Sequence, residues 1–498
     1  MELTFRDPAG ELRLTAGFAL RRVRPNAEEE TQAFLASPLR SSLEQSGDLI
    51  SSRVADSGSH PCVISGEFWL EHPRLDPISY PWEWTTAQWR AAAELTLRIA
   101  GHAIDAGWTL KDATPLNVVF AGPRPMLVDV LSFERRDPRS SVWLAYGQFV
   151  RTFLLPLVAA KYLSWPLRAT LFDRDGYEPR QIYDALPRWR RLNPDLLDVV
   201  TLATLFERPG PKRSGLKQSS GFKKTSLTTD PALATHLLQK RISRLRGQIQ
   251  NAAGRHCDSQ WSRYEQSAVH YQPTDIEEKQ QFVRRALARC QPKRVLDIGA
   301  NTGTYSLLAA DAGATVVALD SDTAALEVLW RTAAKQNKPI TALVVNIARP
   351  TPAAGWRNRE HFSLLDRLNG GFDLVLMLAV IHHLILREQL PLAHIADLCA
   401  GLTRRWLLLE WVPPSDPMFQ EWLRGRDDLY GHLTESDLTH AFAPHFSVIE
   451  RAQLGNGRVL LLLDRTSDRI SERTSDRISI EDSAEQIADS PREEGITA

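Results

Sequence analysis

The sequence predicts an α/β protein with a doubly wound parallel sheet, preceded by a helix-rich α+β domain. Within residues 294–320, a short apolar run leads into a glycine turn, a helical pattern and a second apolar run. That order opens a right-handed parallel crossover, and further apolar runs at 341–345, 372–378 and 406–410 supply the remaining parallel strands. Sheets of this kind bind ligands at the carboxyl ends of their strands.

Composition excludes several classes of protein. The chain has 498 residues, with 60 Lys+Arg and 60 Asp+Glu. The balanced charge gives no global field to attract nucleic acid, so we do not expect that partner. The four cysteines contain no C-x-x-C pair, and the amino terminus has no signal-peptide pattern, which favours a cytoplasmic location. The most apolar segment, 149–163, carries two charges and a proline, so we expect no membrane partner.

Changes in composition divide the chain into four parts. Residues 1–207 form the α+β domain, with short strands and turns to about 75 and a long amphipathic helix over 85–107. A basic Gly/Pro/Ser linker follows at 208–231. Residues 232–464 hold a helical lead-in and the doubly wound domain, and 465–498 form a tail with a tandem RTSDRIS repeat that we expect to be disordered. Oligomeric state is not fixed by these features.

The glycine turn identifies the class of ligand. A dinucleotide fingerprint fails, because Asn301 and Thr304 stand where its second and third glycines belong. The spacing that holds is Asp297, Gly299 and Gly303. It resembles motif I of the class I S-adenosylmethionine-dependent methyltransferases. The fold of that family is Rossmann-like.

This resemblance implies S-adenosyl-L-methionine as the cofactor. In that family a carboxylate closing the second strand takes both ribose hydroxyls, and Asp320 stands at its position. A polar side chain after strand three lies near the adenine amino group, which here is Asn346. The cofactor-binding residues expected from the resemblance are Asp297, Gly299, Asn301, Gly303, Tyr305, Asp320, Ser321, Asn346, Ile347 and Leu378.

Three residues are candidates for general base. His382 and His383 follow the fourth strand, whose exit loop borders cofactor and acceptor in this family. An imidazole titrates near neutral pH and can take a proton from an oxygen or nitrogen acceptor. Glu410, at the end of the fifth strand, is the competing candidate. The alternative is that both histidines only shape the loop. No metal is expected at this site.

A possible second site lies in the first domain. Asp112, Asn117 and Asp129 follow the long helix with a spacing that resembles the catalytic loop and metal-binding segment of protein kinases. No Gly-rich nucleotide loop precedes them, and the first lysine of the chain is Lys111. Only an arginine such as Arg53 could therefore pair with nucleotide phosphates. The alternative is a turn in which Asp112 and Asn117 cap backbone groups.

Further segments, among them Tyr80–Trp84 and Ala379–His383, resemble a bacterial two-part family of nodulation-protein-like methyltransferases. The predicted function is methyl transfer from S-adenosylmethionine to an unidentified acceptor, a small molecule or glycan-type metabolite. Two alternatives stay open: a phosphotransferase fused to a cofactor-binding domain, and a non-catalytic S-adenosylmethionine sensor.

Overall fold

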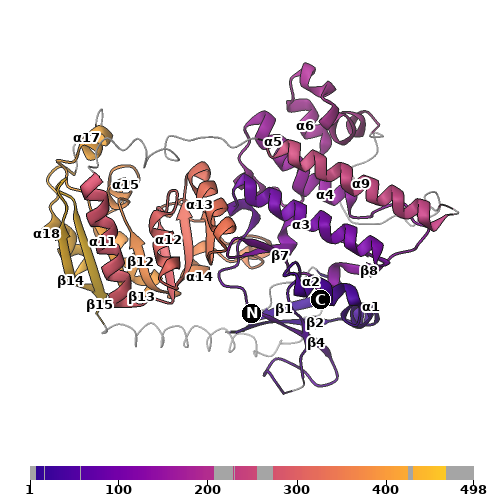
Figure 1. The fold of residues 1–498 in the computed structure, drawn as a ribbon, viewed down its shortest axis with the longest axis horizontal. Coiled ribbons are helices and arrows are strands. Elements are labelled where there is room, and N and C mark those ends of the chain that lie inside the picture. The colour runs from indigo at the N-terminus through magenta and orange to yellow at the C-terminus, as the bar shows by residue number, and fades with distance from the viewer. Residues whose placement is uncertain are drawn as a thin grey trace, which may run out of the picture. The chain divides into compact units, whose positions relative to one another are not determined.

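The structure is a computed structural model that describes residues 7–15, 17–56, 58–206, 228, 230–254, 273–423 and 430–466 (Figure 1). Most of the predicted linker, 208–227 and 229, and the tail from 467 lie outside the described residues. The described residues divide into two compact units: those within 1–269 and 291–371, and those within 270–290 and 372–498. In the described ranges, no helix has the length and apolar character needed to cross a membrane.

A four-stranded antiparallel sheet opens the first unit, in the order β1-β2-β4-β3. Its strands are β1 (Gly10–Leu14), β2 (Phe18–Val23), β3 (Arg53–Val54) and β4 (Phe68–Pro73). Two helices interrupt it, α1 (Pro25–Leu35) and α2 (Pro38–Gln45), where the sequence analysis expected only strands and turns. That expectation was wrong. Each helix begins with a proline in its first turn, and Ser37 caps α2 by accepting a hydrogen bond from the Arg40 N–H.

The long helix α3 (Thr86–Asp105) confirms the prediction for 85–107. Thr85 and Gln88 form a reciprocal capping box, and the helix buries an apolar stripe that includes Trp89 and Leu97. After α3, the chain forms two short ladders: β5 (Trp108–Leu110) pairs with β8 (Phe133–Arg135), and β6 (Val118–Ala121) pairs with β7 (Arg124–Leu127).

Helices complete this part of the unit. They are α4 (Tyr146–Phe149), α5 (Leu155–Leu163), α6 (Pro179–Ala185), α7 (Pro194–Leu196), α8 (Ala203–Leu205) and α9 (Pro231–Ala252). Helix α9 lies along α3 (Figure 1), and Gln239 donates to the Gly101 carbonyl at 2.9 Å. Helix α9 lies in the range predicted for the doubly wound domain, but its contacts are with α3 and α5 of the first domain.

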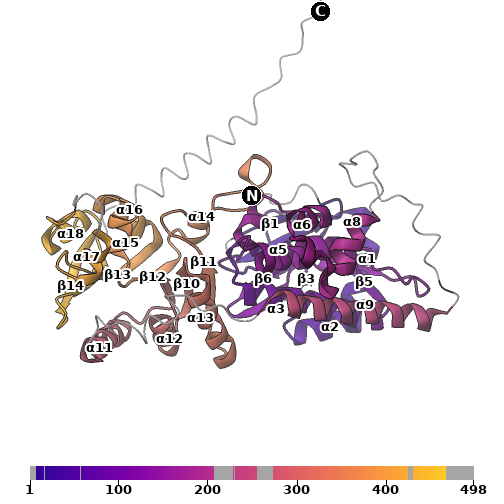
Figure 2. The ribbon, with the colours of Figure 1, turned by 90° about the horizontal axis from the view of Figure 1, so that it is seen from above.

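The first unit also contains three parallel strands in the order β11-β10-β9. They are β9 (Arg294–Ile298), β10 (Thr315–Asp320) and β11 (Ile340–Val344). Helices α12 (Thr304–Asp311) and α13 (Thr323–Gln336) lie on one face of these strands, and α14 (Leu364–Leu368) lies on the other (Figure 2). The alternation of strand and helix is the predicted parallel crossover.

In the second unit, β12 (Phe372–Met377) and β13 (Thr403–Trp411) run parallel. Two antiparallel strands that the sequence analysis did not predict extend them, β15 (Val459–Arg465) and β14 (Phe446–Gln453). The helices are α11 (Pro273–Cys290), α15 (Ile381–Leu386), α16 (Leu392–Leu402), α17 (Pro417–Leu423) and α18 (Glu435–Phe442). The parallel-rich strands and their helices confirm the predicted Rossmann-like α/β class.

A buried polar contact, called the seam here, joins the first domain to helix α14 within the first unit. Glu83 and Arg367 form an ion pair whose side chains are 0% and 3% exposed. A guanidinium nitrogen of Arg367 lies 3.0 Å from a carboxylate oxygen of Glu83. The same guanidinium lies over the Tyr80 ring. Two residues of the segment Tyr80–Trp84 are thus part of this seam.

Replacing Arg367 by Met should destabilise the protein by about 3–5 kcal/mol, because Glu83 would stay buried without its cation. Thermal unfolding of the whole chain measures this change. The control is Arg451→Met, since Arg451 pairs with Glu435 at the surface and is 44% exposed. Loss of that pair should change stability by no more than about 0.5 kcal/mol. Equal effects of the two substitutions would contradict the prediction.

Candidate functional site

The turn after β9 needs its glycines. Gly299, Asn301 and Gly303 have φ of 77°, 49° and 93°, in the left-handed region that favours glycine and asparagine. A Cβ on Gly303 would lie 2.1 Å from a methyl carbon of Leu329. Gly303 therefore allows both the backbone turn and the close packing of α12 and α13.

Asp320 connects this turn to the end of β10. One carboxylate oxygen accepts the Asn301 N–H and the other accepts the Asp322 N–H, each at 2.8 Å. Burial raises the pKa of Asp320 above its usual value, while these backbone donors oppose the shift. Each carboxylate oxygen can accept more than one hydrogen bond. The arrangement therefore suits a ligand with two neighbouring hydroxyl groups.

Two more polar groups lie at the turn. Asp297 is 2% exposed and accepts a hydrogen bond from the Ser306 hydroxyl at 2.6 Å. The side-chain oxygen of Asn301 is buried and has no hydrogen-bond partner in the protein. A buried acceptor of this kind needs a donor, and a ligand with an ammonium or hydroxyl group would satisfy it.

The remaining candidates of the first unit lie at the same edge of the strands. Val344 stands opposite Asp320 in the register, so Asn346 and Ile347 follow β11 beside the end of β10. The Asn346 side-chain oxygen accepts the Ala348 N–H at 2.9 Å. The structure thus brings together nine candidates at the carboxyl ends of three parallel strands: Asp297, Gly299, Asn301, Gly303, Tyr305, Asp320, Ser321, Asn346 and Ile347.

Leu378 and the two histidines belong to the second unit. Leu378 is buried directly after β12, and the next residue, Ala379, has φ of 56°, which is rare for a residue other than glycine. The exit loop of β12 is therefore held in an unusual backbone conformation.

His382 is buried, at 3% exposed, and its Nδ1 has no hydrogen-bond partner. Burial lowers the pKa of His382 well below its usual value, and the charges of His383, Arg458 and Lys279 lower it further. Burial and the neighbouring Arg387 lower the pKa of His383 to about 4. Both imidazoles are therefore neutral near pH 7, the form that can accept a proton.

Glu410 lies in a buried ion-pair network. One oxygen is 2.5 Å from Lys279 Nζ, and the other is 3.4 Å from a guanidinium nitrogen of Arg458. Arg458 also binds Asp416 at 2.8 Å, and all four side chains are at most 6% exposed. Both Glu410 oxygens contact cations, so a role as base would first require breaking an ion pair.

Sequence reasoning missed Lys279, Asp416 and Arg458. A signal existed for Lys279, because it lies on the apolar stripe of α11, four residues before the buried Val283 and seven before the buried Ala286. A lysine on such a stripe needs an acidic partner.

The three residues of the possible second site also lie together. The Asn117 amide donates to Asp112 at 3.4 Å and to the Ser132 hydroxyl at 3.2 Å, and Ser132 donates to Asp129. Burial and the charge of Asp129 raise the pKa of Asp112. A second oxygen of Asp112 is buried without a hydrogen-bond partner.

Arg21, on β2, is the arginine at this second site. It lies 2.7 Å from Asp129, and its side chain is 10% exposed. Arg53, predicted as an example of an arginine that could pair with nucleotide phosphates, is 70% exposed and pairs with Glu71. Within the described ranges, no group of three or more His, Cys, Asp or Glu side chains is arranged to hold a metal ion.

Comparisons with known proteins agree with this geometry. Residues 269–445 match the family model described as a methyltransferase domain. The chain is 27% identical over 478 residues to nodulation protein NoeA of Rhizobium meliloti (strain 1021), covering 93% of this chain and 95% of that protein.

Two solved methyltransferases are among the structures to which the chain is similar. One is N-methyltransferase NodS from Bradyrhizobium japonicum WM9 with S-adenosyl-L-homocysteine, at 16% identity, a TM-score of 0.31 and coverage of 40% of this chain and 92% of NodS. The other is magnesium protoporphyrin IX methyltransferase from Synechocystis PCC 6803, at 20% identity, a TM-score of 0.29 and coverage of 39% and 84%.

The family match falls on the strands that carry the glycine turn and Asp320, and the similarity to NoeA extends over both parts of the chain. Two hydrogen-bond acceptors lie at the turn, the Asp320 carboxylate and the Asn301 side-chain oxygen. They fit a cofactor that donates hydrogen bonds from ribose hydroxyls and an ammonium group. The chain is therefore an S-adenosylmethionine-dependent methyltransferase, with its methyltransferase domain in residues 269–445.

Proposed function

We propose that the protein methylates a small-molecule acceptor of the glycan-metabolite class. The observation that carries the cofactor assignment is Asp320, whose two oxygens are fixed by backbone N–H groups beside a glycine turn. The balance of 60 basic and 60 acidic residues supports a small acceptor, because no global field would recruit nucleic acid.

In this proposal the chain aligns three groups and excludes water. The sulfonium of the cofactor is already an activated methyl donor, so the protein's task is to align acceptor, methyl carbon and sulfur. Asp320 holds the ribose, Asn301 accepts from the amino-acid part, and Asn346 and Ile347 lie at the adenine.

His382 is our choice for the residue that removes the acceptor's proton. It is buried, neutral and has an Nδ1 without a partner, whereas both Glu410 oxygens contact cations. His383 and Glu410 then support the loop and the strand end. If the protein were a non-catalytic sensor, His382 would have no influence on a methyl transfer rate.

The acceptor can be found with labelled cofactor. Purified full-length protein is incubated with S-adenosylmethionine carrying a labelled methyl group and with metabolite extracts, and labelled products are identified by mass spectrometry. Labelled glycans or small molecules would support the proposal. Label in nucleic acid only, or no label with any extract, would contradict it.

Asp320→Ala should weaken cofactor binding by about 2 kcal/mol, or roughly thirtyfold, because two charge-assisted hydrogen bonds to the ribose are lost. Asp320→Asn keeps the shape and should lose less. Calorimetric titration with S-adenosylhomocysteine measures both. Asp311→Ala is the control, since Asp311 is an exposed carboxylate on α12 that pairs with Lys338. Unchanged affinity in folded Asp320→Ala would remove Asp320 from the site.

The maximal rate should not depend on a His382 ionisation between pH 6 and 8. Its pKa lies well below the usual value, so the imidazole is neutral across that range, and activity falls only when pH approaches the lowered pKa. His382→Ala should lower the maximal rate by about 10²–10⁴-fold. A wild-type midpoint near pH 6.5 that disappears in this variant would show that His382 is not neutral as described.

The first domain should not hydrolyse ATP at an ordinary kinase rate. Asp129 already binds Arg21 and the Ser132 hydroxyl, and no lysine precedes Lys111 to pair with nucleotide phosphates. Magnesium-dependent ATP consumption by the full chain should match that of Asp129→Asn. We use the full chain because the Glu83–Arg367 ion pair joins the first domain to α14 within the first unit. Robust turnover that Asp129→Asn abolishes would instead support the phosphotransferase alternative.

A further inference from the structure

The first domain covers the outer edge of β11. Gln88, at the start of α3, is fully buried and donates to the Ala342 carbonyl of β11 at 3.0 Å. On its other side β11 pairs with β10. An edge strand has unpaired backbone groups, and here a side chain from another domain binds one of them.

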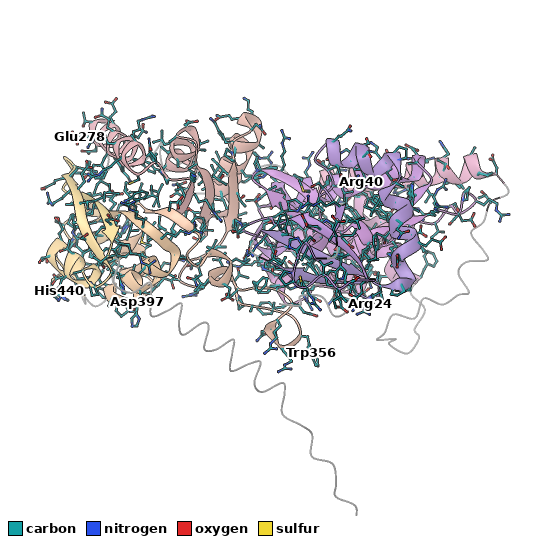
Figure 3. The ribbon with its side chains drawn as sticks, turned by 90° about the horizontal axis from the view of Figure 1, so that it is seen from below. Arg24, Arg40, Glu278, Trp356, Asp397 and His440 are labelled. Carbon is teal, nitrogen blue, oxygen red and sulfur yellow. The ribbon has the colours of Figure 1, made fainter. Side chains whose placement is uncertain are left out.

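The same domain holds the chain after Asn346. The Tyr80 hydroxyl accepts the Phe362 N–H at 3.1 Å, and Arg174 contacts His361 at 2.9 Å and Glu360 at 3.1 Å. Trp356, 61% exposed, lies on the loop between these contacts and β11, and this loop stands out from the neighbouring elements (Figure 3).

The ion pair of Glu83 and Arg367 adds a third contact beyond the loop, on α14. The segment that contains Asn346 is therefore bound by hydrogen bonds or ion pairs before it, at Ala342, and after it, at 360–367. The partners in all of these contacts belong to the first domain.

Helix α13, which follows Asp320, is held in a similar way. The Ala87 N–H donates to Glu327 at 3.0 Å, and the Trp330 indole donates to the Pro123 carbonyl at 3.1 Å. The first domain thus contacts both elements that carry the ribose and adenine side of the site.

We propose that Gln88 and Glu83 are positioning residues for the adenine end of the cofactor. They act through β11 and the segment after it, which they hold so that Asn346 and Ile347 face the base. This inference rests on the proposed function, in which Asn346 lies at the adenine. Selectivity for the base of the cofactor is then a property that the first domain confers on the methyltransferase domain.

The test compares two ligands that differ only at the base. S-adenosylhomocysteine has an adenine amino group, and S-inosylhomocysteine has an oxygen in its place. Calorimetry on the wild-type chain should show preference for the adenine ligand by about tenfold or more, because a site built for a hydrogen bond rejects the analogue that lacks it. In Gln88→Ala and in Glu83→Gln, adenine affinity should fall while inosine affinity changes little.

Gln239→Ala is the matched control. Gln239 also donates from its amide to a backbone carbonyl, at 2.9 Å, but it joins α9 to α3 away from β11. Its loss should leave the ratio of the two affinities unchanged. In a double-mutant cycle, Gln88→Ala should have no further effect on the ratio once Asn346 is replaced by Ala.

Three outcomes would overturn the proposal, and they are distinguishable. An equal loss for both ligands in folded Gln88→Ala and Glu83→Gln would show that these residues only stabilise the fold. A wild-type chain that binds both ligands equally would remove Asn346 from the adenine, and the positioning role with it. A wild-type chain that binds neither ligand would refute the proposed function itself.

Discussion

The two hydrogen bonds that Asp320 accepts from backbone N–H groups organise the cofactor side of this protein. They join the turn after β9 to the end of β10, so that the glycine turn and the carboxylate are linked directly. The turn reaches Asp320 only because Gly299 and Gly303 adopt positive φ, and because Gly303 lets Leu329 pack against it. A change in any of these groups therefore affects how the others meet a ligand.

Much of this was accessible from sequence because its signals are local. The five parallel strands are short apolar runs, and the glycine spacing with Asp320 is contained within 27 residues of β9–β10. The long helix α3 showed a clear stripe and a capping threonine. The helices α1 and α2 also have local start signals, Pro25 and Ser37-Pro38, which favour helices over the predicted strands and turns.

The rest depends on partners that are distant in sequence. The Arg21–Asp129 pair spans 108 positions, and Lys279–Glu410 spans 131. No periodicity shows which of several arginines reaches a given carboxylate, and the sequence therefore does not identify Arg21 as the partner of Asp129. The domain to which α9 belongs was not predictable for the same reason. The sequence of a basic helix after a linker does not indicate which domain the helix packs against. The antiparallel strands β14 and β15 are not connected by a crossover helix, so no alternation of strand and helix in the sequence predicts them.

The contacts of the first domain with β11 and α14 also have a consequence for synthesis. The hydrogen-bond partner of Gln88, Ala342, is synthesised 254 positions later, and the ion-pair partner of Glu83, Arg367, is synthesised 284 positions later. A nascent chain therefore presents an uncompensated Glu83 and the apolar surface around α3 until residue 367 has left the ribosome, and at about 5–20 residues per second that wait is tens of seconds. During that interval the first domain lacks these partners, and a chain truncated before residue 342 would leave both Gln88 and Glu83 without them.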